Sequence, residues 1–355
     1  MENNIINIKN QLKGLTLEEL KEYFKQTGQP AFRGEQLFNW MYNHLSFNFD
    51  EMQNLSKTLR EKLSETCTLK ALELVAVQDS PESGTKKYLF QTSDGSKIES
   101  VVIPEEDRAT LCISTQVGCP LDCKFCATGL MGYKRNLTVG EVVDQYLLSA
   151  KEYGKDKITN IVYMGMGEPL LNYKNTISSL SIFTAEQTKG VSRTRITVST
   201  SGIAPKIKEL ADSGFRVKLA LSLHSCFEDI RSTIMPINKK FPLKDNIEAI
   251  KYFARKTGSR ITFEYTMLKG INDRPEDVKA LSKLAGQIPS KINIIPFNSI
   301  AHMNPGGISA TLVPTPYKDI QHFAQQLRDN NITVMIRETQ GNDIAAACGQ
   351  LAAKY

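Results

Sequence analysis

Short apolar runs rich in Val, Ile and Thr recur from residue 110 onward, and helical stretches separate them. The runs cover residues 110–118, 158–169, 195–202, 217–224, 261–268 and 291–298, with a further run at 331–339. The stretches at 138–154, 203–214 and 245–258 carry apolar residues three and four positions apart, which is typical of amphipathic helices. The alternation predicts a βαβα order and therefore a parallel sheet.

Most of these runs end in Gly, Ser, His, Glu or Asn. In parallel barrels, ligands and catalytic groups gather at the C-terminal ends of the strands. The pattern therefore favours an α/β fold with a partial (βα)6 barrel over residues 106–340. A doubly wound sheet has the same periodicity, so periodicity alone leaves it open.

The N-terminal part of the chain follows a different pattern. Helical spacing in three stretches predicts a small helical accessory domain over residues 1–75. Residues 76–105 read as a linking β-hairpin, because alternating runs flank Asp94-Gly95, a dipeptide typical of tight hairpin turns. Residues 341–355 form a C-terminal tail.

Composition and charge add little to this organisation. The 355 residues are 41% hydrophobic and 23% charged, which is typical of a folded globular protein. The net charge of +6 suits RNA as a partner without requiring it. The N-terminus MENNIINIKNQ lacks the features of a signal peptide, and no long apolar run follows. We therefore expect a cytoplasmic protein with no membrane segment.

Cysteine spacing gives the strongest chemical indication. Cys119, Cys123 and Cys126 place three thiols on the loop after the first predicted barrel strand. Three thiolates leave one iron of a [4Fe–4S] cluster without a protein ligand. That iron can bind the amino and carboxylate groups of S-adenosylmethionine, whose reductive cleavage gives a 5′-deoxyadenosyl radical. A zinc site completed by Cys112 or His224 is the alternative.

Seven collinear motifs narrow this interpretation to one family. Together they resemble the RlmN-type adenine-C2 RNA methyltransferases of the radical S-adenosylmethionine superfamily. The motifs are GCPLDCKFCATGLMGYKRNLT, MGMGEPLLN, STSG, SLH, MPINKK, INIIPFN and DIAAACGQL.

The resemblance implies roles for particular residues. Cys119, Cys123 and Cys126 would hold the cluster. The residues implied as S-adenosylmethionine contacts are Gly167, Glu168, Ser199, Ser222, Leu223, His224 and Asn298.

The same resemblance implies a methyl-cysteine mechanism. Cys348 would carry the methyl group, Glu99 would take the carbon-2 proton, and Cys112 would release the product through a transient disulfide. From its own sequence context, a Cys before Gly at an Ala-rich helix end is equally well a buried structural residue.

The implied substrates are 23S rRNA and tRNA. We also expect an electron donor such as flavodoxin and a monomeric enzyme. Two alternatives stay open: methylation of adenine at carbon 8 by the same cysteines, and a zinc-stabilised RNA-binding protein without catalytic activity.

Overall fold

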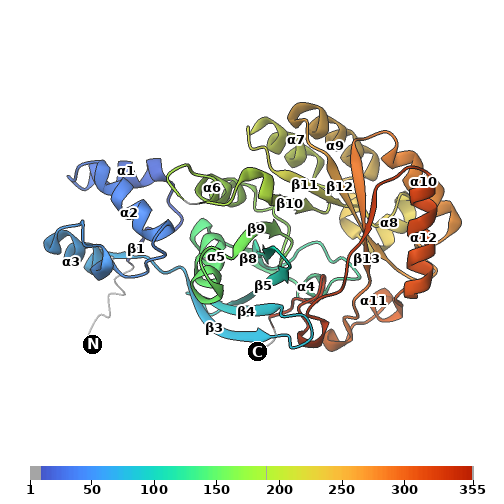
Figure 1. The fold of residues 1–355 in the computed structure, drawn as a ribbon, viewed down its shortest axis with the longest axis horizontal. Coiled ribbons are helices and arrows are strands. Elements are labelled where there is room, and N and C mark those ends of the chain that lie inside the picture. The colour runs from blue at the N-terminus through green and yellow to red at the C-terminus, as the bar shows by residue number, and fades with distance from the viewer. Residues whose placement is uncertain (1–8, 189, 354–355) are drawn as a thin grey trace.

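The parallel part of the structure is a curved sheet with helices along its outer side, and a separate helical lobe lies at one end (Figure 1). The computed structural model describes residues 9–188 and 190–353. The first eight residues of the predicted accessory domain and the last two of the predicted tail lie outside that range.

Seven parallel strands follow one another across the sheet in chain order, as β6-β9-β10-β11-β12-β13-β14. A doubly wound sheet would reverse its strand order part-way across, and no reversal occurs among the described strands. The first six strands give the predicted partial (βα)6 barrel, which is thereby confirmed. The parallel strands are β6 (Arg108–Cys112), β9 (Ile158–Tyr163), β10 (Ile196–Thr200), β11 (Lys218–Ser222), β12 (Ile261–Met267), β13 (Ser290–Pro296) and β14 (Val334–Ile336).

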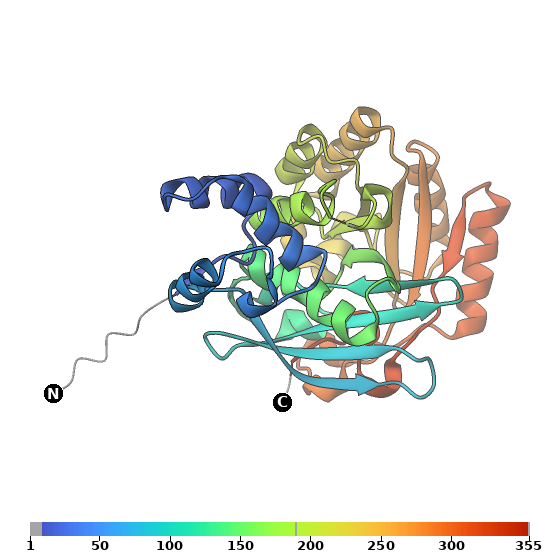
Figure 2. The ribbon, with the colours of Figure 1, turned by 60° about the vertical axis from the view of Figure 1, so that its left-hand side comes forward.

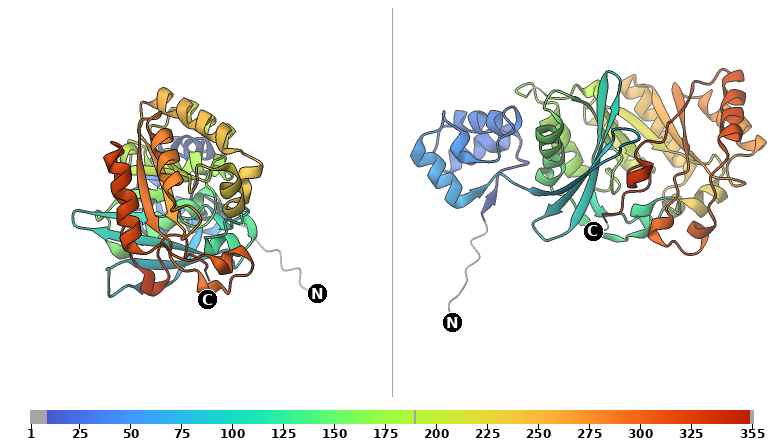
Figure 3. Two further views of the ribbon diagram at one scale, coloured as in Figure 1. Left: turned by 90° about the vertical axis from the view of Figure 1, so that its right-hand side faces the viewer. Right: turned by 60° about the horizontal axis from the view of Figure 1, so that its bottom comes forward.

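Helices connect these strands and cover the outside of the sheet, as Figures 1 and 3 show for α7, α9, α10 and α12. Their apolar faces pack on strands that are buried nearly throughout, such as β12. The helices of the barrel are α4 (Ala127–Leu130), α5 (Val139–Tyr153), α6 (Tyr173–Phe183), α7 (Ala204–Asp212), α8 (Glu228–Ile234), α9 (Leu243–Thr257), α10 (Pro275–Ala285), α11 (Ile308–Thr311) and α12 (Tyr317–Asp329). A small ribbon of β7 (Gln116–Gly118) and β8 (Tyr133–Asn136) flanks the cysteine loop.

The predicted hairpin exists but belongs to a larger unit. Strands β4 (Lys86–Thr92) and β5 (Lys97–Glu105) flank the Asp94-Gly95 turn, where Gly95 has a φ of +77°. Strand β3 (Leu72–Asp79) pairs with β4, and β5 pairs with β6. The segment therefore forms a β extension of the barrel sheet (Figure 2). It begins with β3, before the predicted boundary at residue 75.

The N-terminal lobe holds the three predicted helices, α1 (Leu17–Gln26), α2 (Phe32–Tyr42) and α3 (Lys57–Thr66). Thr16 and Glu19 form a capping box at the start of α1, which supplies partners for the first free N–H groups. Strands β1 (Asn10–Gln11) and β2 (Cys67–Thr68) pair at the base of the lobe. Among the described residues, no helix is long and apolar enough to cross a membrane.

Candidate functional site

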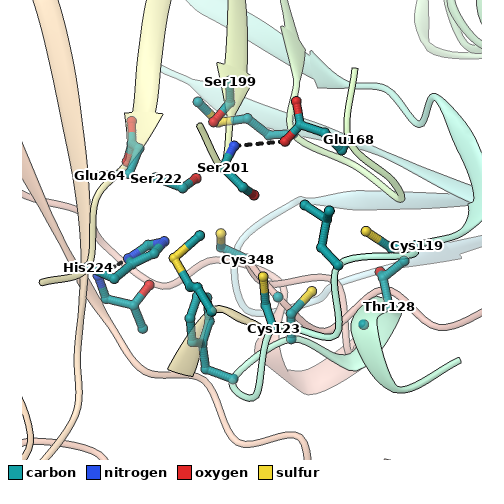
Figure 4. A pocket seen from close by; sticks show the side chains of 18 of the residues that line it. Cys119, Cys123, Thr128, Glu168, Ser199, Ser201, Ser222, His224, Glu264 and Cys348 are labelled. Carbon is teal, nitrogen blue, oxygen red and sulfur yellow. Dashed lines mark hydrogen bonds between the residues drawn. The ribbon is translucent and has the colours of Figure 1, made fainter. Parts of the chain in front are cut away.

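One cavity lies at the C-terminal ends of the barrel strands, where the sequence predicts the site. Together with its open mouth it contains about 940 Å³ of empty space. Its wall combines the cysteine loop, the ends of β9 to β13 and part of the C-terminal tail (Figure 4). The predicted site residues in this wall are Cys119, Cys123, Cys126, Gly167, Glu168, Ser199, Ser222, His224, Asn298 and Cys348.

The three predicted cluster ligands lie on a loop held close to helix α4. A Cβ at Gly129 would lie 2.9 Å from the carbonyl oxygen of Cys123, so only glycine permits this approach. Burial raises the pKa of Cys119 to about 12 and also raises that of Cys123 and Cys126. The thiols are therefore protonated until a metal displaces their protons.

This donor set fits an iron–sulfur cluster. Three thiols face one cavity, and burial disfavours each as a free thiolate, so a positively charged cluster iron supplies the partner that a thiolate needs. Among the described residues, no three His, Cys, Asp or Glu side chains stand close enough to hold a single metal ion.

Glu168 follows β9 and is fixed at both carboxylate oxygens. Oε2 accepts from the Ser201 backbone N–H at 2.7 Å, and Oε1 accepts from the Leu170 N–H at 3.0 Å. Burial raises the pKa of Glu168, while these donors oppose the rise. The preceding Gly167 has a φ of +97°, and a Cβ there would lie 2.5 Å from Gln116. The chain can turn here only with glycine, which brings Glu168 to the cavity.

His224 lines the cavity in its neutral form. Burial, together with the nearby Arg231 charge, lowers its pKa to about 3. Nδ1 accepts from the Thr266 N–H at 2.9 Å, so the ring proton resides on Nε2. The backbone at His224 has a φ of +54°, and Asn272 holds it by donating to the His224 carbonyl at 2.7 Å.

Arg231 is a positioning residue that the sequence motifs do not mark. Its fully buried guanidinium donates to the Leu223 and Ser222 carbonyls at 3.0 and 3.1 Å, and to Ser201 at 2.6 Å. It thereby ties together the loops after β10 and β11. Leu223 is itself buried and takes part through this backbone contact. An arginine in the run DIRSTI looks like a surface charge, so only the fold identifies it.

The C-terminal tail returns to the cysteine loop. The Ala127 N–H donates to the Gly349 carbonyl at 2.7 Å, and the Thr128 hydroxyl donates to the Leu351 carbonyl at 2.6 Å. Asn298 donates to the Cys348 carbonyl at 3.0 Å. These contacts hold Cys348, which is exposed to the cavity, in the same wall as the three loop cysteines.

Cys112 lies at the end of β6, close enough to Cys348 for the two thiols to influence each other. Burial and a negative charge on Cys348 raise the pKa of Cys112 to about 12, while the Arg337 guanidinium acts in the opposite direction. Arg337 has the same effect on Cys348. A cation thus stands beside both predicted redox thiols, a feature that sequence motifs did not indicate.

Glu99 does not face this cavity in the part of the chain that the structure describes. Its Oε2 accepts from the backbone N–H groups of Ala352 and Ala353 at 2.9 and 3.1 Å. Its Oε1 lies 3.5 Å from the buried Lys87 ammonium. The carboxylate of Glu99, the predicted base, is therefore hydrogen-bonded to the same tail that carries Cys348.

Comparisons with known proteins agree with this arrangement. Residues 113–283 match the radical SAM superfamily, and residues 10–69 match the ribosomal RNA large subunit methyltransferase N-terminal domain. A crystal structure of a radical SAM methyltransferase from Sphaerobacter thermophilus is 40% identical, with a TM-score of 0.91, over 97% of this chain and 100% of that chain.

Two curated relatives extend the likeness over nearly the whole length. The dual-specificity RNA methyltransferase RlmN of Geotalea uraniireducens is 43% identical over 96% of both chains. The probable enzyme of the same name from Dictyoglomus turgidum is 42% identical over 98% of this chain and 97% of its own. This chain therefore belongs to the RlmN family of dual-specificity RNA methyltransferases, radical SAM enzymes that use a [4Fe–4S] cluster and S-adenosylmethionine.

Proposed function

We propose that the chain forms 2-methyladenosine in 23S rRNA and tRNA, with Cys348 as the methyl carrier and a protein such as flavodoxin as electron donor to a monomeric enzyme. The observation that carries the proposal is the position of Cys348 in the same cavity wall as Cys119, Cys123 and Cys126, with Cys112 close by. Membership of the family excludes the alternative of a zinc-stabilised RNA-binding protein without catalytic activity.

The cavity residues divide into two groups. Cys119, Cys123 and Cys126 would hold the cluster. When bound, the cluster and S-adenosylmethionine supply the electron and the radical that start the reaction. The residues that would hold S-adenosylmethionine are Gly167, Glu168, Ser199, Ser222, Leu223, His224 and Asn298.

The chemistry assigned to the chain itself needs two thiols and a base. Cys348 accepts a methyl group, and the carbon of that group later bonds to carbon 2 of adenine. Glu99 takes the displaced proton. Cys112 then attacks the Cys348 sulfur, so that a disulfide forms and the bond from that sulfur to the carbon breaks; the carbon takes up a proton and leaves as the methyl group of the base. Arg337 supports both thiols, because a nearby cation favours the reactive thiolate.

A movement of the tail is part of this proposal. The Glu99 oxygen that would take the proton already accepts two hydrogen bonds from Ala352 and Ala353. Glu99 becomes available when these contacts break, and the same segment carries Cys348.

The thiol roles are tested by trapping the covalent intermediate. We expect Cys112→Ala to accumulate a protein–RNA adduct, because the bond from Cys348 to the base can form but cannot be released. Cys348→Ala should form none. Cys67→Ala is the matched control, since Cys67 is also buried but lies in the N-terminal lobe. An adduct in Cys348→Ala would contradict the assignment.

The product is tested separately. Mass spectrometry of digested RNA separates 2-methyladenosine from 8-methyladenosine by comparison with standards. The carbon-8 isomer as product would overturn the carbon-2 proposal while leaving the thiol roles intact.

A further inference from the structure

A second cavity lies along the gap where the barrel fails to close. One side consists of Ile103 and Thr110 on β5 and β6, and the other consists of Ile295 and Met335 on β13 and β14. Because β6 and β13 are the first and last barrel strands, this cavity marks the lateral opening, which we call the seam. Ile295, Asn298, Arg337 and Cys348 line both cavities. The seam therefore leads from the outside of the barrel to Cys348.

Two charged side chains near this junction have unused hydrogen-bonding capacity. Glu264 is 4% exposed; its Oε1 accepts from Asn293 at 3.1 Å, whereas its Oε2 is buried without a partner among the described residues. Among the described residues, the Arg337 guanidinium makes one long contact, 4.0 Å from Nη1 to the sulfur of Met164. A guanidinium offers five N–H donors.

Buried polar groups without partners destabilise the folded protein unless a ligand supplies the missing hydrogen bonds. A buried carboxylate oxygen without a donor loses its hydration and gains nothing in return. Burial raises the pKa of Glu264, and Arg337 is the largest opposing influence, so the two side chains are electrostatic neighbours. Both line the main cavity together with Cys348. The pair therefore fits a ligand that presents a hydrogen-bond donor and an acceptor.

We propose that Glu264 and Arg337 recognise the target adenine, which enters through the seam. Glu264 accepts from the exocyclic amino group, and Arg337 donates to a ring nitrogen beside carbon 2. Guanine presents a carbonyl oxygen in place of that amino group, so the carboxylate repels it. The proposal rests on the function proposed above, since adenine is taken as the substrate.

Base analogues in the RNA test the role of Glu264. The cluster-loaded full chain is mixed with oligonucleotides that carry adenosine, purine riboside or inosine at the target position, and the dissociation constants are measured without S-adenosylmethionine. We expect the wild type to favour adenosine by about tenfold or more, the usual scale for a hydrogen bond to a charged group. In Glu264→Gln the preference for adenosine over inosine should fall or reverse, because an amide N–H can donate to the inosine oxygen. Glu73→Gln, an exposed strand glutamate, is the control and should keep the wild-type order.

A second, independent experiment tests the role of Arg337. RNA with 1-deazaadenosine or 3-deazaadenosine lacks one of the two nitrogens beside carbon 2. We expect one of these analogues to weaken binding to the wild type but not to Arg337→Gln. Thermal unfolding of each variant shows whether it is folded.

Two results would overturn the proposal. In the first, Glu264→Gln binds the three RNAs in the same order of affinity as the wild type, and the deaza analogues weaken RNA binding to Arg337→Gln as much as to the wild type. The other is equal weakening of every RNA together with a raised KM for S-adenosylmethionine, which would assign the pair to the cofactor. Because binding needs no turnover, a carbon-8 product would refute the proposed function while leaving this recognition test intact.

Discussion

At the scale of single residues, His224 shows how burial sets a charge state. Its ring accepts a backbone hydrogen bond from Thr266 and must stay neutral at Nδ1 to do so. Burial lowers its pKa to about 3, whereas a histidine in the unfolded chain has a pKa of about 6.5. Below that pH the unfolded chain binds a proton that the folded chain does not. The free energy of unfolding therefore falls as the pH drops from about 6.5 toward 3.

This difference predicts a measurable pH dependence. Between pH 7.5 and 5, we expect the wild type to lose about 2 kcal/mol of stability that His224→Gln does not lose. Urea unfolding of both proteins at several pH values provides the measurement, and the other titrating groups cancel because both proteins share them. Parallel pH profiles would show that His224 is not responsible.

Sequence and structure differ in what they reveal about individual site residues. The loop cysteines, Gly167 and Glu168 could be predicted as neighbours in one cavity because they stand in short local motifs. Arg231 could not, since its partners come from loops that only the fold brings together. Glu264 does have a signal in the sequence, because it is the one charged residue in the strand-like run ITFEYTM.

At the scale of elements, the barrel strands were predictable because they are buried on both faces and read as continuous apolar runs. The predicted boundary at residue 75 divides strand β3, because most of its positions are exposed or half-buried and give no clear strand pattern in the sequence. The short helices α4, α8 and α11 were not predicted. Helices of so few residues have too little periodicity to be recognised and depend on tertiary packing.

The C-terminal tail is the element whose position matters most for the chemistry. Glu99 holds its end by accepting from Ala352 and Ala353, so removal of the carboxylate should loosen the tail. We expect Glu99→Ala to increase the alkylation rate of Cys348 by iodoacetamide several-fold, as measured by peptide mass spectrometry.

Two variants control this experiment. Glu99→Gln keeps an oxygen that can accept the same N–H groups and should react as slowly as the wild type. Glu73→Ala removes an exposed glutamate on β3 and should also have no effect. Equal alkylation in Glu99→Ala and the wild type would show that the carboxylate does not hold the tail.

At the scale of the whole molecule, a buried ion pair joins the N-terminal lobe to the barrel. Lys13 Nζ lies 3.7 Å from Asp144 Oδ1 on α5, and both side chains are fully buried. Asp144 Oδ2 accepts from the N–H groups of Ala71 and Leu72 at 2.7 and 3.1 Å, where the lobe meets β3. Burial lowers the pKa of Lys13 and raises that of Asp144, so each charge depends on the other. The sequence shows only two distant charges that look exposed.

A double-mutant cycle tests whether the Lys13–Asp144 ion pair stabilises the protein. Lys13→Met should destabilise the protein by about 3–5 kcal/mol, because it leaves the Asp144 charge buried without its partner. Asp144→Asn keeps an oxygen that can accept from Ala71 and Leu72, so adding it to Lys13→Met should recover much of the loss. Urea unfolding of the two single variants and the double variant gives the coupling energy, which we expect to exceed about 1 kcal/mol. Strict additivity of the two single effects would mean that the lobe is held by its apolar contacts and by the close approach of Gly14 to Gly140, and that the ion pair contributes nothing of its own.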